Sequence, residues 1–271
     1  MTEAVRISRI LAPNPGPYTL EGTNTWIVGR DPAVVIDPGP NDDGHLETVA
    51  DEAGPVAQIL LTHRHLDHAE GAPRLAELTG ATVRAFDPLM WQDPLRDGEE
   101  FLVGGGRVRA VHTPGHTHDH VVFWEPDAKL LFTGDAVLGR GTSVVDPPDG
   151  DMALYVASLR TMLELRPTTI YPGHGPTVDD PAAKLKEYLD HRTLRERQVL
   201  AELAGADRPA TPQELAVGIY TGYPTELQPA AARSVLAHLF KLETEGRVRR
   251  TGEVTFELAA TEQPPHEDDR S

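Results

Sequence analysis

The sequence predicts a two-part protein, an α/β body followed by a small winged-helix domain. Residues 27–171 alternate short apolar segments with helical stretches, which is typical of α/β folds. Residues 181–203 form one long helical pattern, and after Gly205 the pattern changes to short helices and a hairpin. We therefore expect a body at 1–204, a winged helix at 205–260 and a disordered polar tail at 261–271.

Seven apolar segments of the body have the length and composition of strands. Most are followed by a loop rich in Gly, Pro or Asp, so most of these strands end in a polar turn. The segments are 33–36, 58–61, 82–85, 107–111, 121–124, 129–132 and 169–171. Three glycines at 104–106 are not followed by a helical pattern, and we interpret them as a hairpin turn, not a phosphate-binding loop.

Helices are expected between these strands. A short helix over 73–79 ends at Gly80, and a longer one over 152–165 ends before Pro167. The longer helix carries apolar residues at helical spacing, which predicts that it covers one face of a sheet. The helix at 181–203 connects the body to the second domain.

The second domain begins with a specific helix signal. Thr211, Pro212 and Glu214 have the spacing of a capping box, which predicts a helix through Ile219. A further helix ends at Gly246 and carries Val235, Leu236, Leu239 and Leu242. Alternating apolar residues around Thr251-Gly252 predict a hairpin formed by Val248, Val254, Phe256 and Leu258.

Composition limits the class of function. The chain has 271 residues, a formal net charge of −17 and no cysteine. No apolar run approaches the roughly 20 residues that span a bilayer, and the N-terminus lacks the pattern of a signal peptide, so we expect a soluble, cytoplasmic protein without membrane partners. The charge argues against a broad basic surface that coats nucleic acid, but leaves a local site open. Any metal must be held by imidazole and carboxylate.

The strongest chemical signal directly follows the apolar segment 58–61. Residues 62–68 are Thr-His-Arg-His-Leu-Asp-His, so three imidazoles and a carboxylate lie at the end of one strand. Neutral imidazole and carboxylate are the ligands that suit zinc. Three partners follow other strands and have neighbouring glycines that allow close backbone approach: His116, Asp135 and His174. Each is weak alone, but their joint occurrence predicts a metal site.

This motif order resembles the metallo-β-lactamase superfamily, and the resemblance implies an αββα sandwich with metals at one edge. More narrowly, the chain resembles the β-lactamase-like protein 2 family, whose characterised members are endoribonucleases acting on single-stranded RNA. The narrower resemblance spans roughly 15–256 and rests on residues 22–25, 113–119, 139–142, 171–176 and the winged-helix segment. His118 departs from the family pattern, where an acidic residue or proline is expected.

The resemblance also implies the ligands of two divalent metal ions. The first metal is held by His63, His65 and His116; the second is held by Asp67, His68 and His174; Asp135 bridges them. We expect zinc, although manganese accepts the same ligands. A metal-bridging hydroxide is the expected nucleophile, oriented by Asp67 as the catalytic carboxylate.

The substrate and several roles stay open at this point. A small-ester hydrolase or thioesterase, as in glyoxalase II, is the alternative to RNA cleavage, but glyoxalase II carries a different C-terminal domain. A true β-lactamase is disfavoured because many place a cysteine in the second metal site. A non-enzymatic winged-helix regulator is disfavoured by the complete ligand set. The oligomeric state is not predicted.

Other polar residues have two interpretations each. Asp37 either hydrogen-bonds a ligand histidine or caps a turn. His118 and His120 are candidate leaving-group acids or structural residues, and we expect structural roles for His45, His112, His191, His238 and His266. Residues 201–260 contain six Lys or Arg and eight acids, so the arginines near the hairpin either touch phosphate or form a solvated edge.

Overall fold

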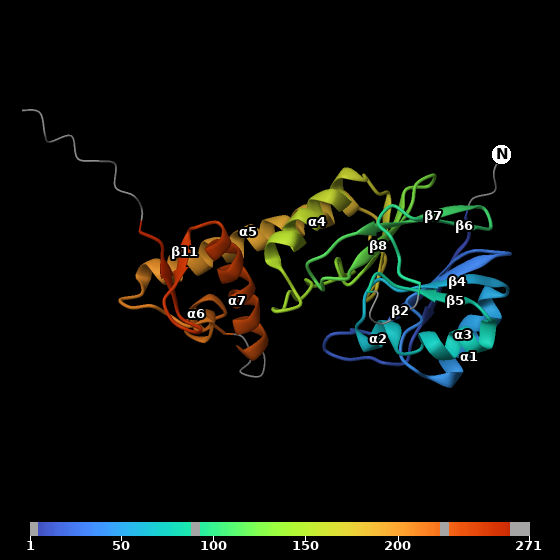
Figure 1. Cartoon of the computed structure of the whole chain (residues 1–271), viewed down its shortest axis with the longest axis horizontal. Helices are drawn as coiled ribbons and strands as arrows, with labels where there is room; N and C mark the ends of the chain where they lie inside the picture. Colours follow the sequence, from blue (N-terminus) through green and yellow to red (C-terminus); the bar gives the residue numbers. More distant parts are fainter. Residues whose placement is uncertain (1–4, 88–92, 223–227, 261–271) are drawn as a thin grey trace, which may run out of the picture. The chain divides into compact units, whose positions relative to one another are not determined.

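The computed structural model describes residues 5–87, 93–222 and 228–260. The chain divides into two compact units, one within residues 1–192 and one within residues 193–271 (Figure 1). Helix α5 (Pro181–Gly205) begins in the first unit and ends in the second. Among the described residues, no helix is both long enough and apolar enough to cross a membrane.

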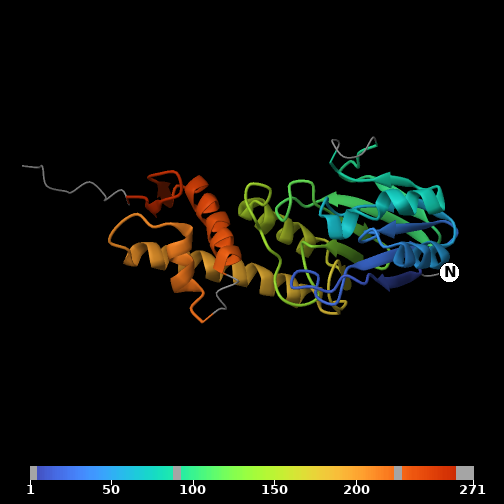
Figure 2. The same ribbon diagram turned by 90° about the horizontal axis from the view of Figure 1, so that it is seen from below.

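Two five-stranded sheets form the centre of the first unit (Figures 1 and 2). The first sheet is antiparallel at one side and parallel at the other, in the order β1 (Ile7–Leu11), β2 (Asn24–Gly29), β3 (Ala33–Ile36), β4 (Val56–Leu60) and β5 (Thr82–Arg84). The second is antiparallel apart from its first pair, in the order β10 (Thr169–Pro172), β9 (Leu130–Gly134), β8 (Val121–Glu125), β7 (Gly106–His112) and β6 (Glu100–Val103).

The two sheets pack face to face on an apolar core. Trp26 and Ile36 of the first sheet belong to the same buried cluster as Phe123 and Phe132 of the second. A further buried cluster joins the first sheet to helices α1 (Asp43–Ala53) and α3 (Ala72–Thr79). Helix α4 (Met152–Glu164) buries Tyr155, Leu159 and Met162. The layers are those of the predicted αββα sandwich.

The seven predicted strands are all present, with small differences at their ends. Strand β6 pairs with β7 in the register Val103↔Gly106, which confirms the hairpin turn at the glycines. The sequence pattern missed three strands, β1, β2 and β6, and helices α1 and α2 (Leu66–Ala69). Strand β1 is only partly buried, so its polar and apolar residues do not mark a strand clearly.

The second unit contains the C-terminal part of α5, α6 (Pro212–Ile219), α7 (Gln228–Thr244) and a hairpin of β11 (Val248–Arg250) and β12 (Phe256–Leu258). Its core includes Val199, Leu215, Leu239 and Phe256. The capping box is confirmed, because the Thr211 side chain accepts from Glu214 N and the Glu214 side chain accepts from Thr211 N. The tail predicted at 261–271 lies outside the described residues.

One detail of the predicted hairpin is wrong. Val254 lies in the loop before β12 and is half exposed. Thr251 N donates to Thr255 O at 2.9 Å, and this bond closes the loop one residue before strand β12 begins. Phe256, which is fully buried, therefore starts the second strand.

Candidate metal centre

The first part of the site is the loop that follows β4. Buried strand residues end at Leu60, and the chain then turns through His63 and His65 into the short helix α2, which carries Asp67 and His68. His68 N donates to His65 O at 3.0 Å, so the turn is closed by its own backbone. The end of strand β4 therefore leads directly into a segment, residues 63–68, that holds four candidate ligands.

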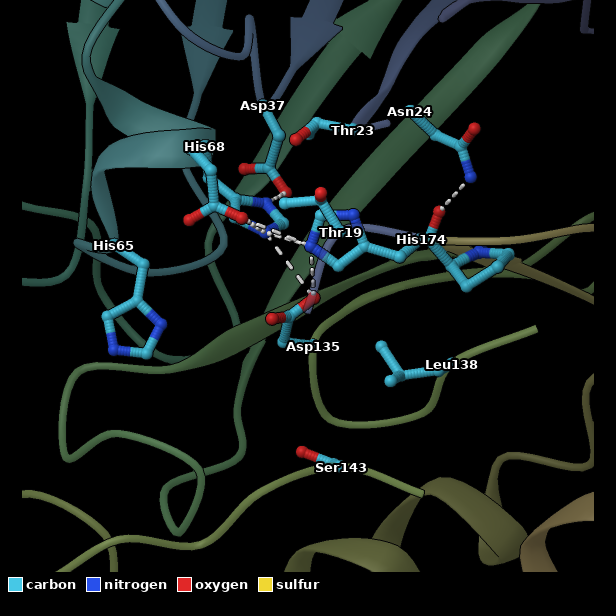
Figure 3. Close-up of polar contacts among 12 residues, drawn as sticks. Thr19, Thr23, Asn24, Asp37, His65, His68, Asp135, Leu138, Ser143 and His174 are labelled. Atoms are coloured by element: carbon cyan, nitrogen blue, oxygen red, sulfur yellow. Dashed lines mark hydrogen bonds and ion pairs between the residues drawn. The ribbon is translucent and has the colours of Figure 1, made fainter. Parts of the chain in front are cut away.

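The structure brings all seven predicted ligands together in two groups. His65, His68, Asp135 and His174 are labelled in Figure 3. Within each group, one donor atom from every residue lies within 4.8 Å of the others. The first group comprises His63, His65, His116 and Asp135, and the second comprises Asp67, His68 and His174.

Asp135 lies between the two groups. Its Oδ1 atom is 3.3 Å from His68 Nε2 and 3.3 Å from His174 Nε2 in the second group. Its Oδ2 atom is 3.8 Å from His116 Nε2 in the first group. One carboxylate thus faces donors of both groups through different oxygens, which is the arrangement expected of a bridging ligand.

Backbone and carboxylate acceptors orient three of the imidazoles. The Nδ1 atoms of His68, His116 and His174 lie 2.9, 2.7 and 3.2 Å from Asp37 Oδ2, Val144 O and Gly22 O. Because each acceptor takes the Nδ1 proton of a neutral ring, the Nε2 lone pair of that ring points into the site. Of the two roles considered for Asp37, the structure shows the hydrogen bond to a histidine, because Asp37 contacts His68, a candidate ligand.

His63 is oriented by a relay that ends at the same Asp37. Thr62 Oγ1 donates to Asp37 Oδ2 at 2.7 Å, so its oxygen accepts from His63 Nδ1 at 3.0 Å. His63 Nε2 is then left buried without a hydrogen-bond partner among the described residues. Asp135 Oδ1 is likewise buried and without a hydrogen bond there.

The charges in the cluster are strongly coupled. Burial and the neighbouring imidazoles lower the pKa of His63 well below its ordinary value, and burial lowers the pKa of His65 to about 4. Burial acts against ionisation of Asp135, but His68 and His174 lower its pKa overall. Burial would lower the pKa of His68, but Asp135, Asp37 and Asp67 raise it well above 6.5. Without a bound cation, a proton on His68 therefore balances the carboxylates.

These observations fit a metal centre. Buried lone pairs that face one another repel unless a cation lies between them, and an orphaned buried acceptor is costly. The donor set of imidazole and carboxylate is that of zinc and related divalent ions. Gly173 makes the close packing possible, because a Cβ there would lie 2.6 Å from His68 Cε1 and 2.9 Å from Asp135 Oδ1.

Sequence reasoning missed most of the supporting groups. Gly22 O and Val144 O act through the backbone, so their side chains carry no signal. Thr62 adjoins the motif but has no predicted role, although it links His63 to Asp37. Only polar contacts between distant segments reveal these roles.

The remaining histidines lie in different surroundings. His118 is exposed, and its Nδ1 atom pairs with Asp149 Oδ1 at 2.7 Å. His120 is buried, is 3.1 Å from Thr113 Oγ1 and stacks on the His63 ring. His45 is hydrogen-bonded to Pro38 O, His112 stacks on Phe86, and His191 and His238 also have partners. His266 lies outside the described residues.

Fold and donor set together define an αββα sandwich with a candidate metal centre at one edge. The chain belongs to the metallo-beta-lactamase superfamily, whose family model matches residues 18–90 and 84–174. The model described as the beta-lactamase associated winged helix domain matches residues 211–256. Members of the superfamily are in general metal-dependent hydrolases.

Several relatives match over nearly the whole chain. The beta-lactamase-like protein 2 homolog of Drosophila melanogaster is 37% identical, with 90% of this chain and 89% of that protein covered. The lactamase-like protein adaB of Aspergillus niger is 37% identical, with 91% and 83% covered. A metallo-beta-lactamase family protein from Thermus thermophilus has a TM-score of 0.78 at 24% identity, with 93% and 98% covered, which shows the shared fold.

Proposed function

We propose that the protein is a hydrolase dependent on two divalent metal ions, zinc by expectation, that cleaves phosphodiester bonds of single-stranded RNA. The observation that carries the proposal is that two ligand groups meet at Asp135. When bound, such a pair of ions polarises a phosphoryl group, stabilises the leaving oxygen and lowers the pKa of a bound water to about 7. The resemblance to the β-lactamase-like protein 2 family favours RNA as the substrate.

Asp67 is the side chain that we assign to proton transfer. Burial would raise its pKa, but His68 and His174 lower it, so the carboxylate is ionised at neutral pH. Its Oδ2 atom lies 3.2 Å from His174 Nε2. The side chain is partly exposed, which leaves its Oδ1 atom to accept a proton from an attacking water.

Two exposed apolar side chains lie in segments that contain or contact predicted ligands. Leu66, between His65 and Asp67, is 68% exposed. Tyr18, 67% exposed, occupies the apex of a turn closed by reciprocal backbone hydrogen bonds between Gly16 and Leu20. That turn leads into Gly22, whose carbonyl contacts His174. We propose that Tyr18 stacks on an unpaired base, because base stacking on aromatic side chains is how single strands are commonly bound.

The winged helix does not supply a free basic surface. Five of its six basic side chains form ion pairs with carboxylates of the same unit: Arg208–Glu214, Lys241–Glu196, Arg247–Glu196, Arg249–Glu257 and Arg250–Glu243. The sixth, Arg233, also has a partner. We therefore propose that phosphate recognition depends on the metal centre and not on the wing.

A small ester or thioester is the second candidate substrate. Near the ligands, Arg64 is paired with Asp149 at 2.8 Å and Arg140 with Glu21 at 2.5 Å. Neutralised cations beside apolar side chains suit an uncharged acyl substrate better than a polyanion. The paired arginines therefore favour an ester or thioester substrate. Both substrate classes are tested in the same experiment.

The test compares cleavage of a fluorescent single-stranded RNA with turnover of a panel of acyl thioesters, using protein loaded with zinc or manganese. Asp135→Ala is the inactive variant, and Asp127→Ala, in the exposed turn after β8, is the matched carboxylate control. RNA cleavage that disappears in Asp135→Ala alone supports the proposal. Intact RNA together with thioester turnover replaces it with the second candidate.

A further inference from the structure

Three buried side chains of helices α4 and α5 hold the loop that follows Asp135. Tyr155 Oη donates to Ala136 O at 2.6 Å, and Leu138 N donates to Tyr188 Oη at 2.9 Å. At the far end of the loop, Arg192 Nη2 donates to Ser143 O at 2.6 Å. Each of these bonds restrains the backbone, so the path of the loop depends on α4, which follows the loop in sequence, and on the more distant α5.

The far end of this loop touches a metal ligand. Val144 O accepts the Nδ1 proton of His116 at 2.7 Å, and Ser143 Oγ lies 3.3 Å from the same nitrogen. The carbonyl of Ser143 belongs to the peptide unit directly before Val144. A side chain that anchors the Ser143 carbonyl therefore sets the position of the group that orients His116.

A buried arginine is an unusual residue for a contact that has only a structural role. Arg192 is only 4% exposed, and its guanidinium lies 5.0 Å above the ring of Tyr155. Within the described part of the chain it forms no ion pair with a carboxylate, and its Nε atom is buried without a hydrogen bond. Burial of an unpaired cation is costly, so a neutral side chain would pack there at lower cost.

We propose, resting on the two-metal function proposed above, that Arg192 is a positioning residue for the first metal-binding group, acting through Ser143 and Val144 on His116. The second group does not depend on this route. Asp37 orients His68, and the carbonyl of Gly22 orients His174. The hydrogen bond of Arg192 goes to Ser143 and not to Asp37 or Gly22. Loss of Arg192 therefore weakens one of two metal-binding steps and leaves the other unchanged.

The experiment measures both binding steps by competition between the protein and a chelator for zinc, with the cobalt(II) absorption spectrum as a second readout. His116→Ala and His174→Ala identify which step belongs to which group. Arg192→Met, which keeps the length of the side chain but has no donor, is expected to weaken the His116 step about 10- to 100-fold. Its cobalt spectrum should change in the bands that His116→Ala removes.

The control and the conservative variant come from the same helix. Arg195→Met removes an arginine that lies 4.3 Å over Tyr220 in the second unit, and both steps should stay at the wild-type values. Arg192→Lys retains a donor and should restore most of the affinity. If Arg192→Met does not fold, Arg192→Gln takes its place, since its amide is too short to reach Ser143 O. Wild-type affinity in the folded variant, or an equal loss at both steps, overturns the proposal.

Discussion

The Nε2 atoms of His68 and His174 lie 3.2 Å apart at the centre of the site (Figure 3). Each ring has its Nδ1 atom beside an acceptor, Asp37 Oδ2 for His68 and Gly22 O for His174. Two neutral rings oriented in this way direct lone pairs at each other, and Asp135 Oδ1 is 3.3 Å from both. A proton or a cation is needed between them, and the surrounding carboxylates favour a divalent ion.

The carboxylate behind His68 should control metal affinity. Asp37→Asn is expected to lower zinc affinity about 10- to 100-fold, because the variant loses the charged acceptor of His68 Nδ1 and of Thr62. Chelator competition measures the change. Asp42→Asn is the matched control, since Asp42 caps α1 and asparagine caps equally well. Equal zinc affinity in the two variants would contradict this role of Asp37.

Metal removal should destabilise the first unit alone. A ligand that binds only the folded state at about 100 times its Kd stabilises that state by ~2.7 kcal/mol. Calorimetry with and without a chelator should therefore show a lower Tm for the unfolding of the first unit and no change for the second. Asp135→Ala provides the comparison, because its Tm should respond much less to the chelator. A shift of both transitions by the same amount would argue against a site confined to the first unit.

Tyr18 should affect RNA binding without affecting the metals. Tyr18→Ala is expected to lower kcat/KM on single-stranded RNA about 5- to 150-fold, mainly through KM, since one stacked base contributes ~1–3 kcal/mol. Tyr18→Trp should retain activity. Leu102→Ala is the control, because Leu102 is 79% exposed on β6 and is not a neighbour of the ligands in sequence. An unchanged KM in Tyr18→Ala would leave RNA cleavage standing but remove the stacking role.

The capping box of α6 should make the second unit sensitive to acid. Hydrogen bonds from Arg208 and Thr211 lower the pKa of Glu214 from 4.5 to about 2. A lowered pKa stabilises the folded state above the unfolded value of 4.5, and this contribution is lost as pH falls through about 2. The Tm difference between wild type and Glu214→Gln should therefore shrink across this range, and added salt should reduce it. A difference that is undiminished at pH 2 would assign the effect to another group.

The candidate ligand residues could be predicted because they cluster at strand ends. Residues 63–68 follow an apolar segment, and His116, Asp135 and His174 each follow another one with a glycine beside them. The network behind the ligands could not be predicted in this way. Arg192 contacts Ser143 across 49 positions, and Trp26 donates to Pro172 O across 146, so neither contact has a local pattern.

The amino-acid sequence alone predicted the α/β pattern of the body, the capped helix of the second domain and a cluster of metal-binding side chains at strand ends, because strand and helix periodicity and ligand chemistry are local properties. The αββα layers and the division of seven donors between two metals came from the resemblance to the metallo-β-lactamase superfamily. Only the tertiary structure decided how those donors are oriented. Ring orientation depends on the Asp37 carboxylate and on the carbonyls of Gly22 and Val144, which reach the site from separate segments. The wing arginines likewise became paired only when folding brought Glu196, Glu243 and Glu257 beside them, because an ion pair depends on distance in space and not on composition.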